Sequence, residues 1–361
     1  MKTLTVALTG REYDILIEKG LLDRAGERCR AVLPKACRLA VVTDNNVAPL
    51  YLERLNRSLE QAGFAVKGIV VPAGESSKSM EMLAYLYEQM LSFGLSRTDA
   101  VVALGGGVVG DLAGFAAATL LRGVDFVQIP TTLLAQVDSS VGGKVAIDLP
   151  AGKNLAGAFW QPKLVLMDPE CLNTLSDKIF SDGMAEVIKY GCIRDEEFFD
   201  FLVRCGGRAG IMEHMERVLC TCCDIKRRVV LADERDTGLR MILNFGHTVG
   251  HAFELAGHYE TWTHGQAVAA GMVWAARLGE RMGITPVGTK DKICAALATY
   301  ALPTHISCPW ETMVEAVGLD KKRTGETLSF VLLERMGWAE PKTMETKQLL
   351  DELKQLYEEA V

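Results

Sequence analysis

The first half of the chain alternates apolar, strand-like runs with amphipathic helical segments, and this alternation restricts the possible folds more than any other feature. The apolar runs lie at residues 38–44, 66–72, 99–104, 124–129 and 163–167. Strands that alternate with helices are typical of an open parallel sheet, in which ligands bind at the carboxyl ends of the strands. The sequence therefore predicts an N-terminal, Rossmann-like α/β domain with a parallel sheet.

A glycine-rich turn follows the third of these runs, at residues 105–111 with the sequence Gly-Gly-Gly-Val-Val-Gly-Asp. A strand, such a turn and a helix together form the arrangement that binds a pyrophosphate at a helix N-terminus. The spacing is not that of the standard dinucleotide fingerprint, so a tight structural turn is the alternative. Asp44 ends an earlier strand and is either a partner for a ribose hydroxyl or a residue that caps the next helix.

Three cations lie on turns beside glycine in the same half: Arg122, Lys144 and Lys153. Loop lysines are usually solvated, but loops also carry binding residues, and these three lie near the predicted nucleotide site in the sequence. The pattern therefore suggests that they bind an anionic ligand.

Beyond residue 176 the strand-like runs give way to helical patterns. These lie at 181–193, 196–205, 211–234, 239–256, 264–282, 290–300 and 344–359, with one isolated apolar run at 328–333. The change predicts two domains, 1–175 and 176–361, the second of them all-helical.

The second half also contains candidate metal ligands. His247 and His251 are four residues apart, so on a helix they lie on one face, and His264 follows shortly afterwards. Glu186 lies in an apolar helical segment, where an unpaired carboxylate would be costly. Two histidines and one glutamate leave an open position, as in a catalytic zinc site. The alternative is that Glu186 pairs with Lys189, one turn away, and that the histidines are packed helix residues.

Further polar groups accompany these candidates. Arg240, Asn244 and His247 are spaced so that all three would face one cleft if they shared a helix, and Lys226 lies on a neighbouring helical segment. A fork-shaped guanidinium suits a carboxylate or a phosphate. The cationic run 320–323 is another candidate, and a solvated helix surface is the alternative for each.

Composition excludes some classes of function. The net charge of -7 disfavours a nucleic-acid-binding protein, and no apolar run reaches the roughly 20 residues that a membrane span needs. The N-terminus has no apolar signal core. Ten cysteines are scattered without a metal-binding spacing, which favours reduced thiols in a cytoplasmic protein.

Taken together, these residues resemble the 3-dehydroquinate synthase family of sugar phosphate cyclases. The segments that carry the resemblance are 74–79, 103–111, 128–144, 152–154, 183–191 and 244–251. The resemblance implies an NAD-binding α/β domain, a helical metal-binding domain, and one zinc or cobalt ion. It also implies a homodimer. The reaction would convert 3-deoxy-D-arabino-heptulosonate 7-phosphate to 3-dehydroquinate and phosphate, by transient oxidation, phosphate elimination, re-reduction and an intramolecular aldol step.

The resemblance assigns roles to individual residues. The metal ligands would be Glu186, His247 and His264, and the catalytic residues would be Asp138, Lys144, Lys189, Arg240 and His251. The NAD site would comprise Asp44, Gly74, Glu75, Lys78, Gly106, Gly107, Val108, Val109, Gly110, Asp111, Thr131, Thr132, Lys144, Lys153, Cys171, Leu172, Asn173 and Thr174. The substrate would be bound by Arg122, Lys144, Asn154, Lys226, Arg240, Asn244, His251 and one of Lys321 and Lys322.

Two positions depart from the family pattern. Gln266 replaces a glutamate two residues after the third metal ligand, which concerns the groups around the ligands rather than the ligands themselves. Asn173 replaces a lysine or arginine in the cofactor segment. The alternatives are a cyclase of another sugar phosphate, a metal-dependent polyol dehydrogenase, and an inactive NAD-binding protein. Arg240 supplies a cation for a substrate carboxylate and so favours the first assignment.

Overall fold

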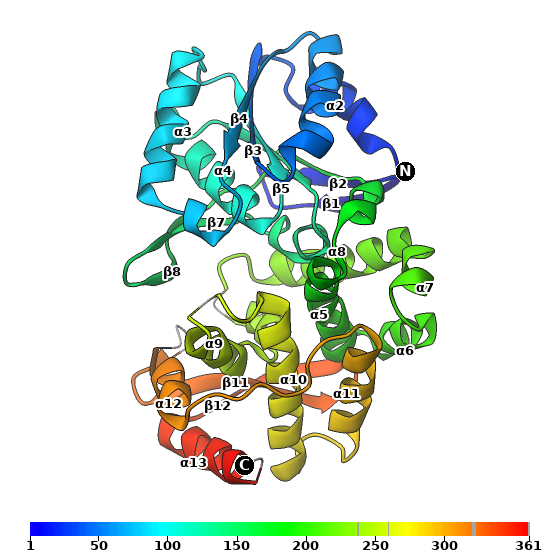
Figure 1. Cartoon of the computed structure of the whole chain (residues 1–361), viewed down its shortest axis with the longest axis vertical. Helices are drawn as coiled ribbons and strands as arrows, with labels where there is room; N and C mark the ends of the chain where they lie inside the picture. The colour runs from blue at the N-terminus through cyan, green and yellow to red at the C-terminus, as the bar shows by residue number, and fades with distance from the viewer. Residues whose placement is uncertain (237, 259, 320–322, 360–361) are drawn as a thin grey trace. The chain divides into compact units, whose positions relative to one another are not determined.

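The computed structural model describes residues 1–236, 238–258, 260–319 and 323–359 (Figure 1). It divides the chain into two compact units, which are considered separately. The first unit contains residues 1–176 and 219–231, and the second contains residues 177–218 and 232–361. The segment 219–231 therefore belongs to the first unit, although the sequence pattern assigned it to the second domain.

A seven-stranded sheet forms the centre of the first unit. Its strands are β1 (Lys2–Val6), β2 (Tyr13–Ile17), β3 (Arg38–Asp44), β4 (Ala65–Val71), β5 (Ala100–Gly105), β6 (Asp125–Pro130) and β9 (Leu164–Met167), in the order β1-β2-β9-β6-β5-β3-β4. All neighbouring strands are parallel except β1 and β2. The predicted parallel sheet is therefore confirmed.

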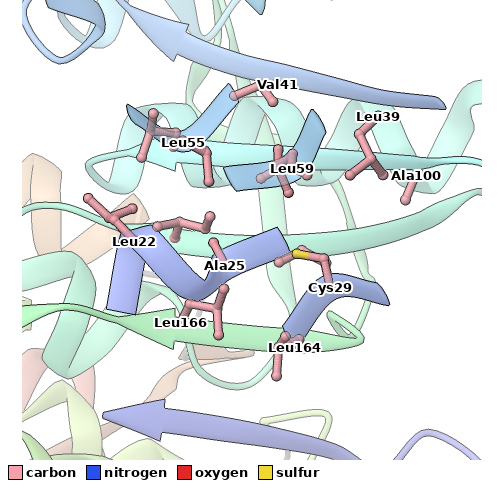
Figure 2. Packing of buried hydrophobic residues seen from close by; sticks show 14 of the residues in the cluster. Leu22, Ala25, Cys29, Leu39, Val41, Leu55, Leu59, Ala100, Leu164 and Leu166 are labelled. Carbon is pink, nitrogen blue, oxygen red and sulfur yellow. The ribbon is translucent and has the colours of Figure 1, made fainter. Parts of the chain in front are cut away.

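Helices cover both faces of this sheet. The covering helices are α1 (Ala25–Val32), α2 (Ala48–Gln61), α3 (Met80–Ser92) and α4 (Gly107–Thr119). The unit also contains the short helices η1 (Leu21–Arg24), η2 (Glu75–Ser77), η3 (Leu120–Arg122), η4 (Ala135–Ser139) and η5 (Pro169–Thr174). Alternate residues of β3 point to opposite faces. Leu39 and Val41 pack with α1 and α2 (Figure 2), whereas Ala40 and Val42 pack with α3 and α4. Each face of the sheet thus has its own hydrophobic cluster.

The order of the strands creates a switch point at β3. From β3 the chain passes to β4 on one side, and then returns to β5 on the other side. In sheets of this kind the helices leave in opposite directions at such a point, and ligands bind outside the strand ends there. The end of β3 is Asp44, and the end of β5 is the glycine-rich turn.

A separate antiparallel hairpin follows in the same unit, made of β7 (Lys144–Leu149) and β8 (Gly152–Phe159). The residues before it, 135–139, form a short π-helical turn. The register of the hairpin pairs Lys144 with Phe159.

Helices dominate the second unit. They are α5 (Asp177–Arg194), α6 (Glu196–Cys205), α7 (Arg208–Met212), η6 (Leu239–Asn244), α9 (His247–Ala256), α10 (His264–Arg281), α11 (Thr289–Thr299), α12 (Trp310–Leu319) and α13 (Thr346–Glu358). Helix α8 (Met215–Ala232) has residues in both units. Every residue from Gly183 to Ile193 of α5 is buried, as expected of a helix packed on all sides.

The prediction that this part is all-helical is wrong. Strands β10 (Arg323–Thr324), β11 (Thr327–Arg335) and β12 (Trp338–Glu345) form an antiparallel sheet. The apolar run 328–333 lies in β11. Its partner β12 was not predicted from the sequence, because β12 contains Pro341 and several charged residues. For the same reason the last helix begins at Thr346 rather than at 344.

The prediction of one continuous helix from 239 to 256 is also wrong. A 3₁₀ helix ends at Asn244, and α9 begins at His247. Between them Gly246 has φ +81°, a conformation that glycine adopts readily and that ends a right-handed helix. Arg240 and Asn244 therefore do not share a helix with His247. No helix among the described residues is long and apolar enough to cross a membrane.

Candidate metal centre and cofactor site

Three candidate metal ligands come together in the second unit: Glu186 on α5, His247 on α9 and His264 on α10. One ligand atom of each lies within 4.8 Å of the other two. The Nε2 atoms of both histidines are 3.5 Å from Oε1 of Glu186. This oxygen is buried and has no hydrogen-bond partner in the described part of the chain.

These distances fit a metal better than they fit hydrogen bonds. A distance of 3.5 Å is long for a hydrogen bond between nitrogen and oxygen. Ligand atoms about 2.0–2.2 Å from a tetrahedral zinc ion lie about 3.3–3.6 Å apart. A buried carboxylate oxygen without a donor is costly unless a cation satisfies it. The donor set, one carboxylate and two imidazoles, is also a typical catalytic zinc set with an open position.

Both histidines occupy the first residue of their helices. The break at Gly246 places His247 at the start of α9. Thr263 caps α10: its hydroxyl accepts from the Gln266 backbone N–H, while the Gln266 side chain accepts from the Thr263 N–H. Gln266 therefore serves as a capping residue here. The Gly265 N–H donates to Oδ1 of Asp182 at 2.5 Å, which docks the start of α10 on α5.

The second nitrogen of each imidazole has its own partner. Nδ1 of His247 lies 3.2 Å from the carbonyl oxygen of Phe245, and Nδ1 of His264 lies 3.2 Å from Oε1 of Glu254. Such contacts place the proton on Nδ1 and leave the lone pair of Nε2 for a metal. Glu254 was missed in the sequence, although it lies seven residues after His247 and three after His251, on the same helix face.

Glu186 also forms the ion pair that was the alternative interpretation. Lys189 donates to Oε2 of Glu186, and both side chains are almost fully buried. The two interpretations are compatible, because each carboxylate oxygen has a different environment: one contacts an ammonium and the other faces two imidazoles.

In the metal-free protein the two imidazoles differ in basicity. Burial lowers the pKa of His247 well below its ordinary value, and the nearby charges of Lys189 and His264 add to the effect. Burial also opposes protonation of His264, but its contacts with Glu186 and Glu254 outweigh burial and raise its pKa well above the ordinary value. A divalent cation would replace the proton between His264 and Glu186.

The remaining predicted residues of the second unit lie at several places. Arg240 is buried; its Nη1 donates to the carbonyl oxygen of Glu234 at 2.7 Å. Asn244 ends η6 and is half-buried. His251 is exposed, and its ring lies 5.9 Å from that of His247. Lys321 and Lys322 lie outside the described residues.

In the first unit, Asp44 lies at the carboxyl end of β3, and the glycine-rich turn lies at the carboxyl end of β5. Oδ1 of Asp44 accepts from the backbone N–H groups of Asn46 and Val47, so Asp44 helps to start α2. Helix α4 begins at Gly107, and no side chain caps it. A Cβ atom on Gly106 would lie 3.1 Å from Thr132, which explains the need for a small residue.

A buried lysine connects several of the predicted cofactor residues. Nζ of Lys78 is 2.8 Å from Oδ2 of Asp111, 2.5 Å from Oδ1 of Asn154 and 3.5 Å from Oε1 of Glu75. Burial raises the pKa of Asp111 to about 6, although the adjacent Lys78 opposes the increase. Lys153 lies 3.7 Å from the same oxygen of Glu75.

Lys226 belongs to the first unit. Its Nζ is 2.7 Å from the carbonyl oxygen and 2.8 Å from Oδ1 of Asp138. These two residues, predicted separately for substrate binding and catalysis, thus form one pair. The exposed Arg122 lies on a turn with φ +71°. Lys144 is also exposed, at the first residue of β7.

The other predicted cofactor residues vary in exposure. Thr131 is buried, and its hydroxyl has no hydrogen-bond partner in the described part of the chain. The side chains of Cys171 and Leu172 are buried, so only their backbone groups could meet a cofactor. The hydroxyl of Thr174 is 2.6 Å from that of Tyr51, and Asn173 is exposed.

Gly74, with φ +108°, precedes the turn that carries Glu75. Val108, Val109 and Gly110 lie in the first turn of α4, where Val109 is buried.

Comparison with known proteins places the chain in a family. Residues 68–182 match the family model of the 3-dehydroquinate synthase N-terminal domain, and residues 183–323 match the C-terminal one. A 3-dehydroquinate synthase of Clostridium botulinum is 48% identical over 93% of this chain and 96% of its own length.

Solved structures show the same fold. A 2-deoxy-scyllo-inosose synthase, complexed with carbaglucose-6-phosphate, NAD+ and Co2+, has a TM-score of 0.88 at 24% identity and covers 98% of this chain and 100% of its own. A 2-epi-5-epi-valiolone synthase from Streptomyces hygroscopicus, with NAD+ and Zn2+ bound, has a TM-score of 0.85 at 26% identity and covers 97% of each chain. The predicted family and fold class are confirmed, apart from the small second sheet: the chain belongs to the 3-dehydroquinate synthase family.

Proposed function

We propose that this chain is an NAD- and metal-dependent 3-dehydroquinate synthase. It converts 3-deoxy-D-arabino-heptulosonate 7-phosphate to 3-dehydroquinate and phosphate, a step of the shikimate pathway to aromatic amino acids. The observation that carries the proposal is the buried Oε1 of Glu186, in a chain with this family's sequence. It lies 3.5 Å from two imidazole nitrogens and has no hydrogen-bond partner among the residues that the structure describes. Relatives with the family's name match over almost the full length.

The second unit supplies the metal ligands in this proposal. Glu186, His247 and His264 hold one zinc or cobalt ion, which when bound polarises a substrate hydroxyl and stabilises negative charge on oxygen. Lys189 pairs with Oε2 of Glu186 and fixes the orientation of the carboxylate. Arg240 and Asn244 bind anionic or hydroxyl groups of the substrate, and His251 positions a hydroxyl or transfers a proton.

The first unit supplies the NAD site, at the switch point beside β3. NAD when bound provides a hydride acceptor that is regenerated within each turnover, so no net redox change occurs. The backbone N–H groups at the start of α4 bind its pyrophosphate, and Asp44 meets a ribose hydroxyl. Support comes from the uncapped start of α4 and from the position of Asp44 at the end of β3.

Several cations of the first unit bind the anionic groups of the substrate in this proposal: Arg122, Lys144 and Lys226, together with the amide of Asn154. The pair of Lys226 and Asp138 places an ammonium and a carboxylate together, which suits the orientation of a hydroxyl beside a phosphate. Lys78 and Lys153 hold the turn at Glu75 next to the hairpin that carries Asn154.

Two other activities deserve comparison. Cyclases of other sugar phosphates share the fold, but the family models and the relatives at 44–48% identity favour 3-dehydroquinate synthase. A polyol dehydrogenase with a similar fold would release NADH. The structure of a probable glycerol dehydrogenase from Sinorhizobium meliloti aligns at a TM-score of 0.62 and 15% identity, less closely than the cyclase structures.

The test is phosphate release from 3-deoxy-D-arabino-heptulosonate 7-phosphate with NAD and zinc, while NADH absorbance is followed. We expect phosphate release that stops after chelation, returns with zinc, and proceeds without accumulation of NADH. Glu186→Gln, loaded with the same zinc concentration, is the matched control and should be inactive. Accumulation of NADH would indicate a dehydrogenase, and no phosphate release from the fully loaded protein would refute the assignment of the substrate.

The proposal includes a cytoplasmic homodimer. All ten cysteines are free thiols, as expected in a reducing compartment. Most oligomers of soluble enzymes have closed symmetry, and a dimer is the commonest form. Sedimentation equilibrium of the purified protein tests the dimer, since a monomer mass of 39.4 kDa at micromolar concentration would contradict it. Fractionation of the source cells tests the location.

A further inference from the structure

A buried carboxylate that no predicted role includes lies behind the metal ligands. Glu254 is 7% exposed and occupies the eighth residue of α9. Its Oε1 lies 3.2 Å from Nδ1 of His264, the ring nitrogen that points away from Glu186. A buried carboxylate is costly unless it is paired, and this contact helps to compensate the loss of hydration.

Close packing of two helices makes this contact possible. A Cβ atom on Gly271 of α10 would lie 2.0 Å from the carbonyl oxygen of Gly246, at the start of α9. One on Gly250 would lie 3.2 Å from the carbonyl oxygen of Ala267. Because glycines let the two backbones touch, a side chain two turns into α9 can reach the first residue of α10.

The two histidines differ in how they are oriented. Nδ1 of His247 faces the backbone carbonyl of Phe245, which is neutral and cannot be removed by substitution. Nδ1 of His264 faces a carboxylate, which is charged and can be removed. A neutral imidazole carries one ring proton. If that proton is on Nδ1 and shared with Glu254, the lone pair of Nε2 points toward Glu186.

We propose that Glu254 is a positioning residue of the metal centre. It fixes the tautomer and the ring orientation of His264, and its negative charge makes Nε2 a stronger donor to a divalent cation. The inference rests on the proposed metal site. Carboxylate partners of ligating histidines typically change metal affinity by roughly 10–100-fold when they are removed.

Two substitutions separate the hydrogen bond from the charge. Glu254→Gln keeps an acceptor for Nδ1 but loses the charge, whereas Glu254→Leu loses both. Glu260→Leu is the matched control, because Glu260 is exposed and follows α9 closely in the chain. All proteins are stripped with a chelator, and thermal unfolding of the stripped forms checks that each variant is folded.

The measurement is the dissociation constant for Zn²⁺, by competition with a chromophoric chelator, together with the visible absorption spectrum of the Co²⁺ form. We expect Glu254→Leu to bind Zn²⁺ roughly 10–100-fold more weakly and Glu254→Gln about 3–10-fold more weakly. We also expect the Co²⁺ spectrum to change in both variants and the control to behave as wild type. Saturating zinc should restore much of the kcat of the leucine variant, because the defect is in affinity.

Wild-type affinity, within about twofold, and an unchanged Co²⁺ spectrum in Glu254→Gln and Glu254→Leu would overturn the inference, since outer partners normally change affinity by more. If Glu254→Leu does not fold, the isosteric glutamine variant decides by the same criterion. A wild-type protein that binds no Zn²⁺ would instead refute the proposed metal site itself. The two failures are therefore distinguishable.

Discussion

Glu186 shows how one buried side chain determines the chemistry around it. Its Oε2 contacts the Lys189 ammonium, which cancels the carboxylate charge within the interior. Its Oε1 faces the Nε2 atoms of His247 and His264, both at 3.5 Å. A divalent cation that enters this site meets the ion pair of Glu186 and Lys189, which has no net charge, and displaces the proton that His264 holds toward Glu186.

The first prediction at this scale concerns His247→Ala. Removal of one of three ligands should abolish tight metal binding and lower kcat/KM by more than about a hundredfold, since the metal polarises the reacting group. Bound metal is measured by elemental analysis after gel filtration. His305→Ala is the matched control, because His305 is exposed. Full activity in a metal-free His247→Ala protein would contradict the ligand assignment.

Asp111 allows a prediction of pH dependence. Burial raises its pKa from 3.8 to about 6 in the folded protein. The folded state therefore binds the proton more tightly than the unfolded state, so this group makes the protein less stable as the pH rises from about 4 to 6. A shift of this size corresponds to roughly 2–3 kcal/mol in the free energy of unfolding.

The measurement compares wild type with Asp111→Asn, which does not titrate. Urea unfolding at about pH 4.5 and about pH 7.5 gives the free energy of unfolding of each protein. We expect the wild type to gain stability relative to Asp111→Asn at the lower pH, by roughly 1–2 kcal/mol after partial titration. Because every other group is shared, a difference that is the same at both pH values would contradict the prediction.

At the scale of elements, the break before α9 gives a third prediction. Gly246→Ala should destabilise the protein by more than about 2 kcal/mol, because φ +81° is strained for alanine and its Cβ would lie 2.7 Å from the Met272 backbone nitrogen. Gly283→Ala is the matched control: Gly283 has φ +69°, and nothing lies within 4 Å of its added Cβ. This control should lose only about 1 kcal/mol, the cost of the left-handed conformation alone. If urea unfolding shows that Gly246→Ala and Gly283→Ala lose the same free energy of unfolding, the close approach of α9 and α10 at Gly246 adds no cost, and the prediction is wrong.

Elements with a strong local pattern could be predicted from the sequence, and elements defined by tertiary contacts could not. Strand β3 was predicted at its observed bounds because seven consecutive residues combine apolar character with a terminal acid. Strand β12 was missed because it is half-exposed and contains Pro341, so its pairing with β11 is what makes it a strand. Helix α12 was missed as well.

In the candidate site, too, some residues could be predicted from the sequence and others depend on tertiary contacts. Glu186, His247 and His264 could be proposed as a set from residue types and from the family resemblance, and the structure brings them together. The contact of Glu254 with His264 depends on the approach of α9 and α10, which no local pattern reports. The pairing of Lys226 with Asp138 is similar, since 88 residues separate the two in sequence.

At the scale of the whole molecule, the two units hold different predicted ligands. All three proposed metal ligands belong to the second unit, on α5, α9 and α10. The predicted pyrophosphate site, at the ends of β3 and β5, belongs to the first. A ligand that binds only the folded state raises the free energy of unfolding. The increase is about 4 kcal/mol when the free ligand concentration is a thousand times the dissociation constant.

The fourth prediction is that each ligand protects its own unit from hydrogen exchange. Zinc added to the stripped protein should slow exchange in α5, α9 and α10 and leave β3 and β5 nearly unchanged, because local opening of the helices would break metal bonds. NAD added without metal should slow exchange at the ends of β3 and β5. Peptide-resolved mass spectrometry measures both effects, and His247→Ala should lose the zinc effect while keeping that of NAD. Zinc protection confined to β3 and β5 would refute the assignment of the metal to the second unit.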